Sequence, residues 1–377
     1  MPHLVAIDLP GGPAFVDALR REWDAGNAVL PIDRRLPGPA RAALLDAMQP
    51  DRLIDEHGRH HRTGPGVEAG DALVMATSGS TGAPKGVVLT HAAVAASAHA
   101  TSRHLGIGRG DRWLACLPLA HVGGLSVVTR AVITDTALEV HDGFDADRVE
   151  DAARRGATAV SLVATALRRI DAALFRVIVL GGARPPADRP PNTVTTYGLT
   201  ETGSGVVYDG RPLEGVDVRI ADDGEVLLRG PMMLRCYRDG STPLDEDGWL
   251  RTGDLGRFLP DGRLHVEGRR GDMIVTGGEN VWPDAVEAVL QQHPAVAEVA
   301  VAGVPDAEWG HRVVAWVVPA PGDPPTLATL RAWVGERLAA FQAPKELHLV
   351  RELPRTALGK VQRHVLQASR AEATDHH

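Results

Sequence analysis

Three short, predominantly apolar runs between residues 113 and 200 constrain the fold more than any other feature of this sequence. The runs WLACLPL, ATAVSLVA and FRVIVLGG are separated by stretches that are compatible with helices. Strands that are apolar throughout are buried on both faces, as in parallel sheets that helices cover. The pattern therefore predicts a mostly parallel sheet with helices on both faces.

Residues 216–229 and 263–267 follow a different pattern. Here VDVRI, EVLLRG and RLHVEG alternate apolar and polar side chains around the turns DDG and DGR. Alternation with a period of two, interrupted by glycine-containing turns, is typical of antiparallel hairpins. We therefore expect antiparallel strands after the parallel sheet.

The pattern changes again after the segment GRRGD at residues 268–272. The helix, two strands, helix and β-segment predicted there occupy residues 283–292, 297–304, 312–318, about 326–340 and about 346–350. Together these elements make a compact α+β unit.

A chain of 377 residues exceeds what one ordinary hydrophobic core supports, so we expect two domains. The boundary is placed at Gly271, between an N-terminal domain of residues 1–270 and a C-terminal domain of residues 271–368. Residues 369–377 form a polar tail. The predicted fold class is α/β.

Charge and cysteine content argue against several classes of protein. The formal net charge is −8 and no basic face is evident, which argues against nucleic-acid binding. The cluster HGRHHR at residues 57–62 has no metal-ligand spacing, so we interpret it as a solvated loop. Cys116 and Cys236 are too far apart in sequence for a CxxC motif, which favours a reducing compartment. Since neither a signal peptide nor a membrane span is evident, we expect a cytoplasmic protein.

The strongest local signal for chemistry is TSGSTGAPKGV at residues 77–87, which follows a predicted strand. Its glycines let backbone N–H groups approach an anion, its hydroxyls can donate to phosphate oxygens, and Lys85 adds positive charge. A run of this kind is more often a flexible loop, and its spacing is not that of a Walker A loop. The strand before it and the lysine after it nevertheless favour a phosphate-binding loop, formed by Thr77, Ser78, Gly79, Ser80, Thr81, Gly82 and Lys85. After it, Thr90 is expected to cap a helix at residues 91–104.

This segment resembles the phosphate loop of the ANL superfamily, which comprises acyl-CoA synthetases, adenylation domains and luciferases. Five further stretches resemble that family in the same order, so the resemblance covers residues 70–366: PLAHVGGL, TTYGLTET, GWLRTGDLG, GRRGDMIVTGGENVWPDAVE and LPRTALGKVQR. It implies a large N-terminal domain of layered, mostly parallel sheets with helices and a small β-barrel-like part. A small, mobile C-terminal α+β domain would follow.

The resemblance also implies which residues bind ATP. Tyr197 would stack on the adenine, Thr200 would contact the α-phosphate, and Glu201 would hold Mg²⁺, a hard cation that prefers oxygen ligands. Asp254 would accept both ribose hydroxyls, and Arg269 would reach the ribose or a phosphate.

Other positions match family motifs for the acid, coenzyme A and catalysis. His121 alone would be interpreted as a core side chain, but its neighbours resemble the family's acyl pocket and thioester-forming site. Gly277 and Gly278 belong to a GGEN loop that would face the pantetheine tunnel. Lys360 stands in the R-T-x-x-G-K-x-x-R frame of the family's catalytic lysine, and Gly271 replaces the usual hinge aspartate.

These residues imply a ligase that works in two steps. A carboxylate must first attack the α-phosphate of ATP, and positioned cations lower the barrier between two anions. Lys360, Lys85 and Mg²⁺ on Glu201 would supply that charge. A thiol must then reach the adenylate where Lys360 had been, so a small domain rotating about Gly271 would serve the second step.

The acid substrate is less constrained. Only 76 residues precede the phosphate loop, and this short form with TTYGLTETGSGVVYDG resembles the o-succinylbenzoate–CoA ligases of actinobacterial menaquinone biosynthesis. Their substrate has a second carboxylate, for which Ser204, His121 and Arg184 are candidate partners. Another aromatic or short aliphatic acid, an acyl-AMP ligase that loads a carrier protein, and a non-catalytic nucleotide-binding protein remain alternatives. The expected partners are small molecules, with a homodimer as an option.

Overall fold

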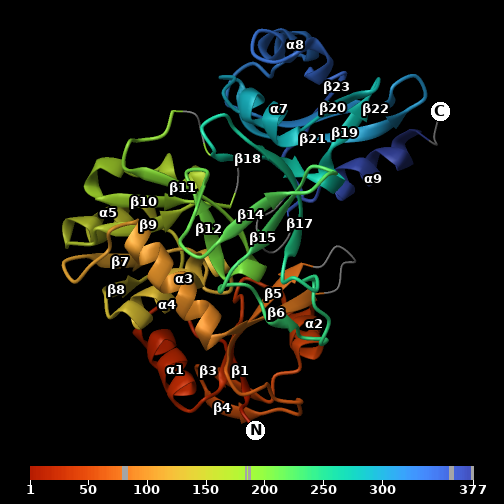
Figure 1. The fold of residues 1–377 in the computed structure, drawn as a ribbon. Helices are drawn as coiled ribbons and strands as arrows, with labels where there is room; N and C mark the ends of the chain where they lie inside the picture. The colour runs from red at the N-terminus through yellow and green to blue at the C-terminus, as the bar shows by residue number, and fades with distance from the viewer. Residues whose placement is uncertain (79–83, 183–184, 186–187, 356–360, 375–377) are drawn as a thin grey trace. The chain divides into compact units, whose positions relative to one another are not determined.

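The computed structural model describes residues 1–78, 84–182, 185, 188–355 and 361–374 (Figure 1). The chain divides into two compact units. The first comprises Met1–Ala221, Val226–Thr252 and Phe258–His265, and the second comprises Asp222–Glu225, Gly253–Arg257 and Val266–His377. The domain boundary at Gly271 stays a prediction.

Seven strands form the first sheet, in the order β16-β6-β5-β2-β1-β3-β4. Its central strands are parallel, since β1 pairs with β2 and β3, and β2 pairs with β5. Antiparallel strands complete both edges. The strands are β1 (Leu4–Ile7), β2 (Ala28–Pro31), β3 (Arg52–Asp55), β4 (Gly58–His61), β5 (Asp71–Ser78), β6 (Pro84–Thr90) and β16 (Cys236–Tyr237), and the connecting helices are α1 (Pro13–Asp24) and α2 (Gly38–Met48).

The burial of this first sheet differs between its centre and its edge. Every residue of β1 and β2 is buried, whereas every residue of β4 is exposed. The interpretation of HGRHHR as a loop is therefore wrong, because residues 58–61 pair with β3 as an edge strand. Polar and charged side chains are compatible with an edge, where one side of the strand faces solvent.

The second sheet confirms the predicted parallel arrangement. It has the order β13-β12-β11-β10-β9-β7-β8, and the pairs from β11 to β8 are parallel. Its strands are β7 (Arg112–Ala115), β8 (Ala137–Val140), β9 (Ala159–Leu162), β10 (Val177–Leu180), β11 (Thr193–Leu199), β12 (Ser204–Tyr208) and β13 (Arg211–Pro212). All residues of β9 and β10 are buried, as their apolar sequences predict.

Helices α3 (His91–His104) and α4 (Val122–Thr134) lie side by side between these two sheets (Figure 1). Helix α3 contacts β5 and β6, while α4 contacts β7, β8 and β9. Helix α3 begins as predicted, because the hydroxyl of Thr90 accepts the N–H of Ala93 at 3.1 Å. The remaining helical segments of this region are α5 (Ala146–Arg154), α6 (Ala164–Leu167), η1 (Ala172–Leu174) and η2 (Thr200–Thr202).

A third sheet, in the order β14-β15-β17-β18, matches the predicted hairpin region. Its strands are β14 (Asp217–Ile220), β15 (Glu225–Arg229), β17 (Leu250–Phe258) and β18 (Leu264–Arg269). Strands β14 and β15 are antiparallel. The division between the two units runs through this sheet.

The second unit contains a five-stranded sheet with the order β20-β19-β22-β21, in which β23 also pairs with β22. Its strands are β19 (Ile274–Thr276), β20 (Glu279–Val281), β21 (Val296–Asp306), β22 (Gly310–Pro319) and β23 (Glu346–Leu349). The helical segments are η3 (Arg270–Asp272), α7 (Pro283–Leu290), α8 (Leu327–Gly335), η4 (Ala340–Gln342) and α9 (Arg363–Thr374). The predicted order of elements is confirmed, although α8 ends at Gly335, since glycine is a poor helix former. Over the described ranges, every helix is too short or too polar to traverse a bilayer.

Candidate active site

The hairpin of β5 and β6 sets the ends of the predicted phosphate loop. Thr77 lies opposite Lys85, and Ser78 lies opposite Pro84. The hydroxyl of Thr77 is 3.4 Å from the backbone oxygen of Lys85, whose side chain is exposed. The loop residues outside the described part of the chain are Gly79, Ser80, Thr81 and Gly82.

A tight turn between β11 and β12 carries Thr200 and Glu201. Leu199 donates its N–H to the hydroxyl of Thr202 at 2.9 Å. That buried hydroxyl lies 2.7 Å from the carbonyl oxygen of Ser204. Thr202 therefore fixes the turn from the inside, and Thr200 and Glu201 remain partly exposed.

Tyr197 precedes this turn at an irregularity in the strand pairing. The register between β11 and β12 shifts between Tyr197 and Gly198. A Cβ atom at Gly198 would lie 2.3 Å from the backbone oxygen of Ser204, so only glycine permits this close approach. The predicted adenine contact of the half-buried Tyr197 stays a prediction.

One residue that sequence analysis missed, Tyr237 on β16, contacts two predicted site residues. Its hydroxyl donates a hydrogen bond of 3.0 Å to Oε1 of Glu201. The Nζ atom of Lys85 lies 5.1 Å from the centroid of its ring. The structure thus brings Lys85 and Glu201 to a single side chain, although 115 residues separate them in sequence.

His121 lies beside an ion pair from the N-terminal region. Its Nε2 is 3.1 Å from Nη2 of Arg35, which binds Asp33 at 2.7 Å. Because a guanidinium only donates, Nε2 of His121 is the acceptor in this arrangement. Burial raises the pKa of Asp33, but the hydrogen bonds and charge of Arg35 outweigh it and hold that pKa below its usual range. Neither Asp33 nor Arg35 was predicted.

Ser204, a candidate partner for a second carboxylate, contacts a buried arginine on α4. Nη2 of Arg130 donates to the hydroxyl of Ser204 at 3.4 Å, and Arg130 is only 2% exposed. The guanidinium lies 4.9 Å from the ring of Trp113, and burial lowers its pKa. Within the described residues, Nε and Nη1 of Arg130 have no hydrogen-bond partner. Arg184 lies outside those residues.

We expect Arg130→Met to increase the free energy of unfolding by about 1–2 kcal/mol. The substitution keeps most of the buried volume and removes unsatisfied donors and a poorly compensated charge. Urea denaturation of the full chain, with Arg34→Met on the surface as the control, measures the effect. A loss of stability instead would mean that the guanidinium is well compensated.

Asp254 and Arg269 lie together in the second unit. Nε of Arg269 is 3.0 Å from Oδ1 of Asp254, which is 7% exposed. Gly253, with φ of 73°, allows this approach because a Cβ atom there would lie 3.3 Å from Nη1 of Arg269. The structure therefore pairs these two residues, and their contacts with a ribose stay predictions.

Gly277 and Gly278 form the turn between β19 and β20. Their φ angles are 58° and 83°, which favour glycine. Thr276 and Glu279 pair on either side of this turn. Gly271 lies in η3 without a positive φ. Both the coenzyme A loop and the hinge stay predictions.

The structure describes both flanks of the predicted catalytic lysine, but Lys360 itself lies outside the described residues. Arg355 and Val361 form an antiparallel bridge. Arg363 is held in place by several hydrogen bonds, among them one of 2.6 Å to Asp284 and one of 2.9 Å to Glu287.

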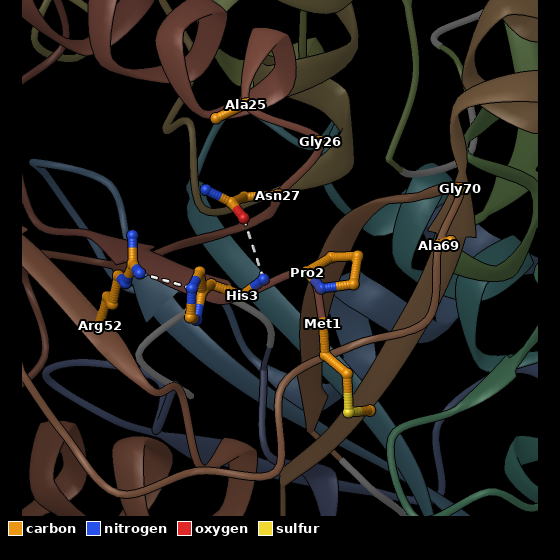
Figure 2. A pocket seen from close by; sticks show the side chains of 9 residues that line it. All are labelled: Met1, Pro2, His3, Ala25, Gly26, Asn27, Arg52, Ala69 and Gly70. Atoms are coloured by element: carbon orange, nitrogen blue, oxygen red, sulfur yellow. Dashed lines mark hydrogen bonds between the residues drawn. The ribbon is translucent and has the colours of Figure 1, made fainter.

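A cavity of about 560 Å³ lies near the N-terminus (Figure 2). It is lined by Met1, Pro2, His3, Ala25, Gly26, Asn27, Arg52, Ala69 and Gly70. The backbone N–H of His3 donates to Asn27 at 2.9 Å, and its ring contacts Arg52 and Asp51. None of the predicted site residues lines this cavity, so it lies apart from the candidate active site.

Glu201 is compatible with a magnesium ion that phosphates share. Its carboxylate is partly exposed and accepts one hydrogen bond, on Oε1, from the described residues. In the described ranges no three His, Cys, Asp or Glu side chains gather into a metal site. Magnesium commonly takes one or two protein carboxylates and completes its octahedron with phosphates and water, which fits this single carboxylate.

Comparison with known proteins gives matches over most of the chain. The model of the AMP-binding enzyme family matches residues 55–238, and that of the AMP-binding enzyme C-terminal domain matches residues 285–360. The chain is 41% identical to the probable 2-succinylbenzoate–CoA ligase of Mycobacterium tuberculosis strain H37Rv, covering 87% of this chain and 95% of that protein. It is 37% identical to the 2-succinylbenzoate–CoA ligase of Bacillus licheniformis, covering 78% and 69%.

Solved structures agree with the sequence matches. The o-succinylbenzoate CoA synthetase (MenE) of Bacillus subtilis, in complex with its acyl-adenylate intermediate, superimposes with a TM-score of 0.87 at 30% identity over 97% of this chain and 88% of that one. The same enzyme with ATP and a magnesium ion gives a TM-score of 0.85 at 29% identity, over 96% and 88%. On this evidence, and in agreement with the motifs of its sequence, the chain belongs to the family of AMP-binding enzymes.

Proposed function

We propose that this protein is an ATP-dependent, AMP-forming ligase that activates a carboxylic acid as an acyl-adenylate and transfers it to coenzyme A. The observation that carries the proposal is the contact of Lys85 and Glu201 with one side chain, Tyr237. A cationic and an anionic group held this close suit a triphosphate and its magnesium ion. Family membership supports the same chemistry.

The proposed acid is o-succinylbenzoate, and the product is o-succinylbenzoyl-CoA for menaquinone biosynthesis. The named relatives and the Bacillus subtilis structures support this choice, because 2-succinylbenzoate is the acid in their names. A second carboxylate needs a hydrogen-bond donor. Since Ser204 accepts from Arg130, its own hydroxyl hydrogen is free to donate to that group.

In the first step, a carboxylate oxygen of the acid attacks the α-phosphorus of ATP between positive charges, the bond to the β-phosphate breaks, and pyrophosphate leaves. Lys85 and the hydroxyl loop bind the outer phosphates, and Thr200 and Lys360 bind the α-phosphate and the incoming carboxylate. Glu201 would hold the magnesium ion, which would supply further charge neutralisation when bound. No general base is needed, because the acid is ionised at neutral pH.

In the second step, the thiol of coenzyme A attacks the carbonyl carbon of the adenylate and AMP leaves. The C-terminal domain withdraws Lys360 by rotation about Gly271 and presents Gly277 and Gly278 to the pantetheine. Asp254 and Arg269 keep the adenosine in place, and His121 lines the acyl pocket.

An assay with ATP, Mg²⁺ and a panel of acids, with and without coenzyme A, tests this proposal. We expect sustained release of AMP and pyrophosphate only with coenzyme A, and highest kcat/KM for o-succinylbenzoate. Turnover with another aromatic or aliphatic acid would retain the reaction but change the substrate. Turnover only with an added carrier protein would favour the acyl-AMP ligase alternative, and absence of AMP with every acid would favour a nucleotide-binding protein.

The proposal also covers the cellular compartment and the oligomeric state of the protein. We expect a cytoplasmic enzyme, with a homodimer as an option for its assembly. Cell fractionation and light scattering of the purified chain measure the two properties directly.

A further inference from the structure

Both ends of Glu201 are held by one short segment, residues 234–237. The N–H of Leu234 donates to the backbone oxygen of Glu201 at 2.7 Å. Three residues later, the hydroxyl of Tyr237 donates to Oε1 of the same glutamate at 3.0 Å. Backbone and carboxylate of the proposed magnesium ligand are thus positioned together.

This segment is itself fixed to the strand that carries Lys85. Tyr237 pairs with Val87 in β6, and the N–H of Arg238 donates to the oxygen of Gly86 at 2.7 Å. The guanidinium of Arg238 donates to the carbonyl oxygens of Met48, Gly66 and Gln49 at 3.0, 2.5 and 3.3 Å. The position of Tyr237 therefore follows from backbone pairing.

A tyrosine at position 237 leaves the negative charge of Glu201 in place. A phenol donates a hydrogen bond without neutralising the carboxylate, whereas lysine or arginine there would compete with a metal ion. The donated bond occupies Oε1, and Oε2 accepts no hydrogen bond from the described part of the chain. One carboxylate oxygen of Glu201 is therefore oriented and the other is available.

The ring of Tyr237 contacts the positive charge of Lys85. Nζ of Lys85 lies 5.1 Å from the ring centroid, within the range of a cation–π contact. Among the described residues, no carboxylate forms an ion pair with Lys85. The cation over the ring forms no ion pair with Glu201, and although its charge also lowers the pKa of Asp239, it stays exposed and accessible to a ligand.

We propose that Tyr237 is a positioning residue for magnesium-bound ATP: its hydroxyl orients Glu201, and its ring keeps Lys85 apart from that carboxylate. This inference rests on the proposed function. It predicts that loss of the hydroxyl reduces the gain in ATP affinity that Mg²⁺ gives. Loss of the ring should in addition reduce the ATP affinity that is measured without Mg²⁺.

Two substitutions separate these effects. Tyr237→Phe removes the hydroxyl and keeps the ring, while Tyr237→Leu removes both. ATP affinity is measured by calorimetry in excess Mg²⁺ and in EDTA. We expect Tyr237→Phe to reduce the gain in affinity from Mg²⁺ by about threefold to tenfold, with a change of less than about twofold in EDTA. Tyr237→Leu should additionally weaken binding in EDTA by about threefold.

The matched control is Tyr208→Phe, which removes the hydroxyl of a buried tyrosine that contacts Thr101 at 3.2 Å. It should leave the magnesium gain unchanged. Kinetics give a second readout: excess Mg²⁺ should restore kcat of Tyr237→Phe, which a general loss of folded protein would not allow.

An unchanged magnesium gain in Tyr237→Phe, or an equal loss with and without Mg²⁺, overturns the inference. Failure of the proposed function looks different, because the unsubstituted protein would then show no magnesium-dependent ATP binding or no AMP formation. If Tyr237→Leu does not fold, Tyr237→Phe still decides the role of the hydroxyl.

Discussion

Lys360→Ala is expected to slow acyl-adenylate formation by about 10²-fold to 10³-fold, while most thioester formation from supplied adenylate persists. The carboxylate and the α-phosphate are both anions, and loss of one positioned group that stabilises transition-state charge costs about this factor. The lysine has no such task once the adenylate exists. Single-turnover pyrophosphate release measures the first step, and reaction of a prepared adenylate with coenzyme A measures the second.

Lysine is rare in this chain, so its place in two of the motifs supports a role for an ammonium group at position 360. The chain has 40 lysines and arginines, of which only Lys85, Lys345 and Lys360 are lysines. Two of the three stand in the proposed phosphate-binding and catalytic motifs. Because a compact ammonium and a planar guanidinium are not interchangeable, Lys360→Arg should restore at most about a tenth of the first-step rate.

Lys345→Ala is the matched control for the loss of one lysine from the second unit. Its Nζ lies over the ring of Trp309, and it belongs to none of the motifs. We expect the adenylation rate of Lys345→Ala to stay within about twofold of that of the unsubstituted protein. Equal loss of both half-reactions in Lys360→Ala, or survival of both, would contradict the assigned role.

Arg363→Met is expected to lower the stability of the second unit by about 2–4 kcal/mol. Arg363 contacts the carboxylates of Asp272, Asp284 and Glu287 at 3.2, 2.6 and 2.9 Å, and its side chain is 23% exposed. Burial raises the pKa of Glu287, and the charge of Arg363 counteracts that rise. Without the arginine, Glu287 keeps the N–H of Val301 but has no cation partner among the described residues.

A double-mutant cycle isolates this interaction. Glu287→Leu in the Arg363→Met background should recover most of the loss, because it removes the uncompensated charge. Urea denaturation and hydrogen exchange of β21 and β22 in the full chain measure the effect. If the double variant is as unstable as Arg363→Met, packing rather than charge explains the loss.

The same pair predicts a dependence on pH. A raised pKa means that folded Glu287 retains its proton at pH values where the unfolded chain has lost it. The folded state then binds more protons, so the contribution of Glu287 to stability falls as pH rises from its ordinary value of 4.5 through the folded value. Arg363→Met raises the folded pKa of Glu287 further, so the loss of stability that this substitution causes should be smaller at about pH 4.5 than at about pH 7.5. A penalty that does not depend on pH would contradict this explanation.

The sequence predicts local features of the fold well. The runs that become β7, β9 and β10 are apolar enough to identify a buried parallel sheet, and Thr90 identifies the start of α3. Strand β4 was missed because GRHH has no apolar residue, and its pairing with β3 depends on a neighbouring strand. The intrinsic strand propensity of these residues does not indicate that they pair at the edge of a sheet.

The candidate site likewise combines residues that local motifs predict with residues that only tertiary contacts bring in. Lys85 and Glu201 could be proposed because they stand in motifs, but Tyr237 belongs to none of those motifs. Its role depends on the register of β16 against β6, which places it beside a residue 36 positions earlier in the chain. The contact of Arg35 with His121 likewise joins residues 86 positions apart. Such contacts arise from tertiary packing and leave no local pattern.

A crystal structure of the protein with ATP and Mg²⁺ tests the central claim most directly. We predict the adenine on Tyr197, the ribose on Asp254, a magnesium ion on Oε2 of Glu201, and Lys85 against the outer phosphates. Nucleotide bound elsewhere, or bound with Lys85 and Glu201 contacting neither phosphate nor metal, would contradict the proposed mechanism.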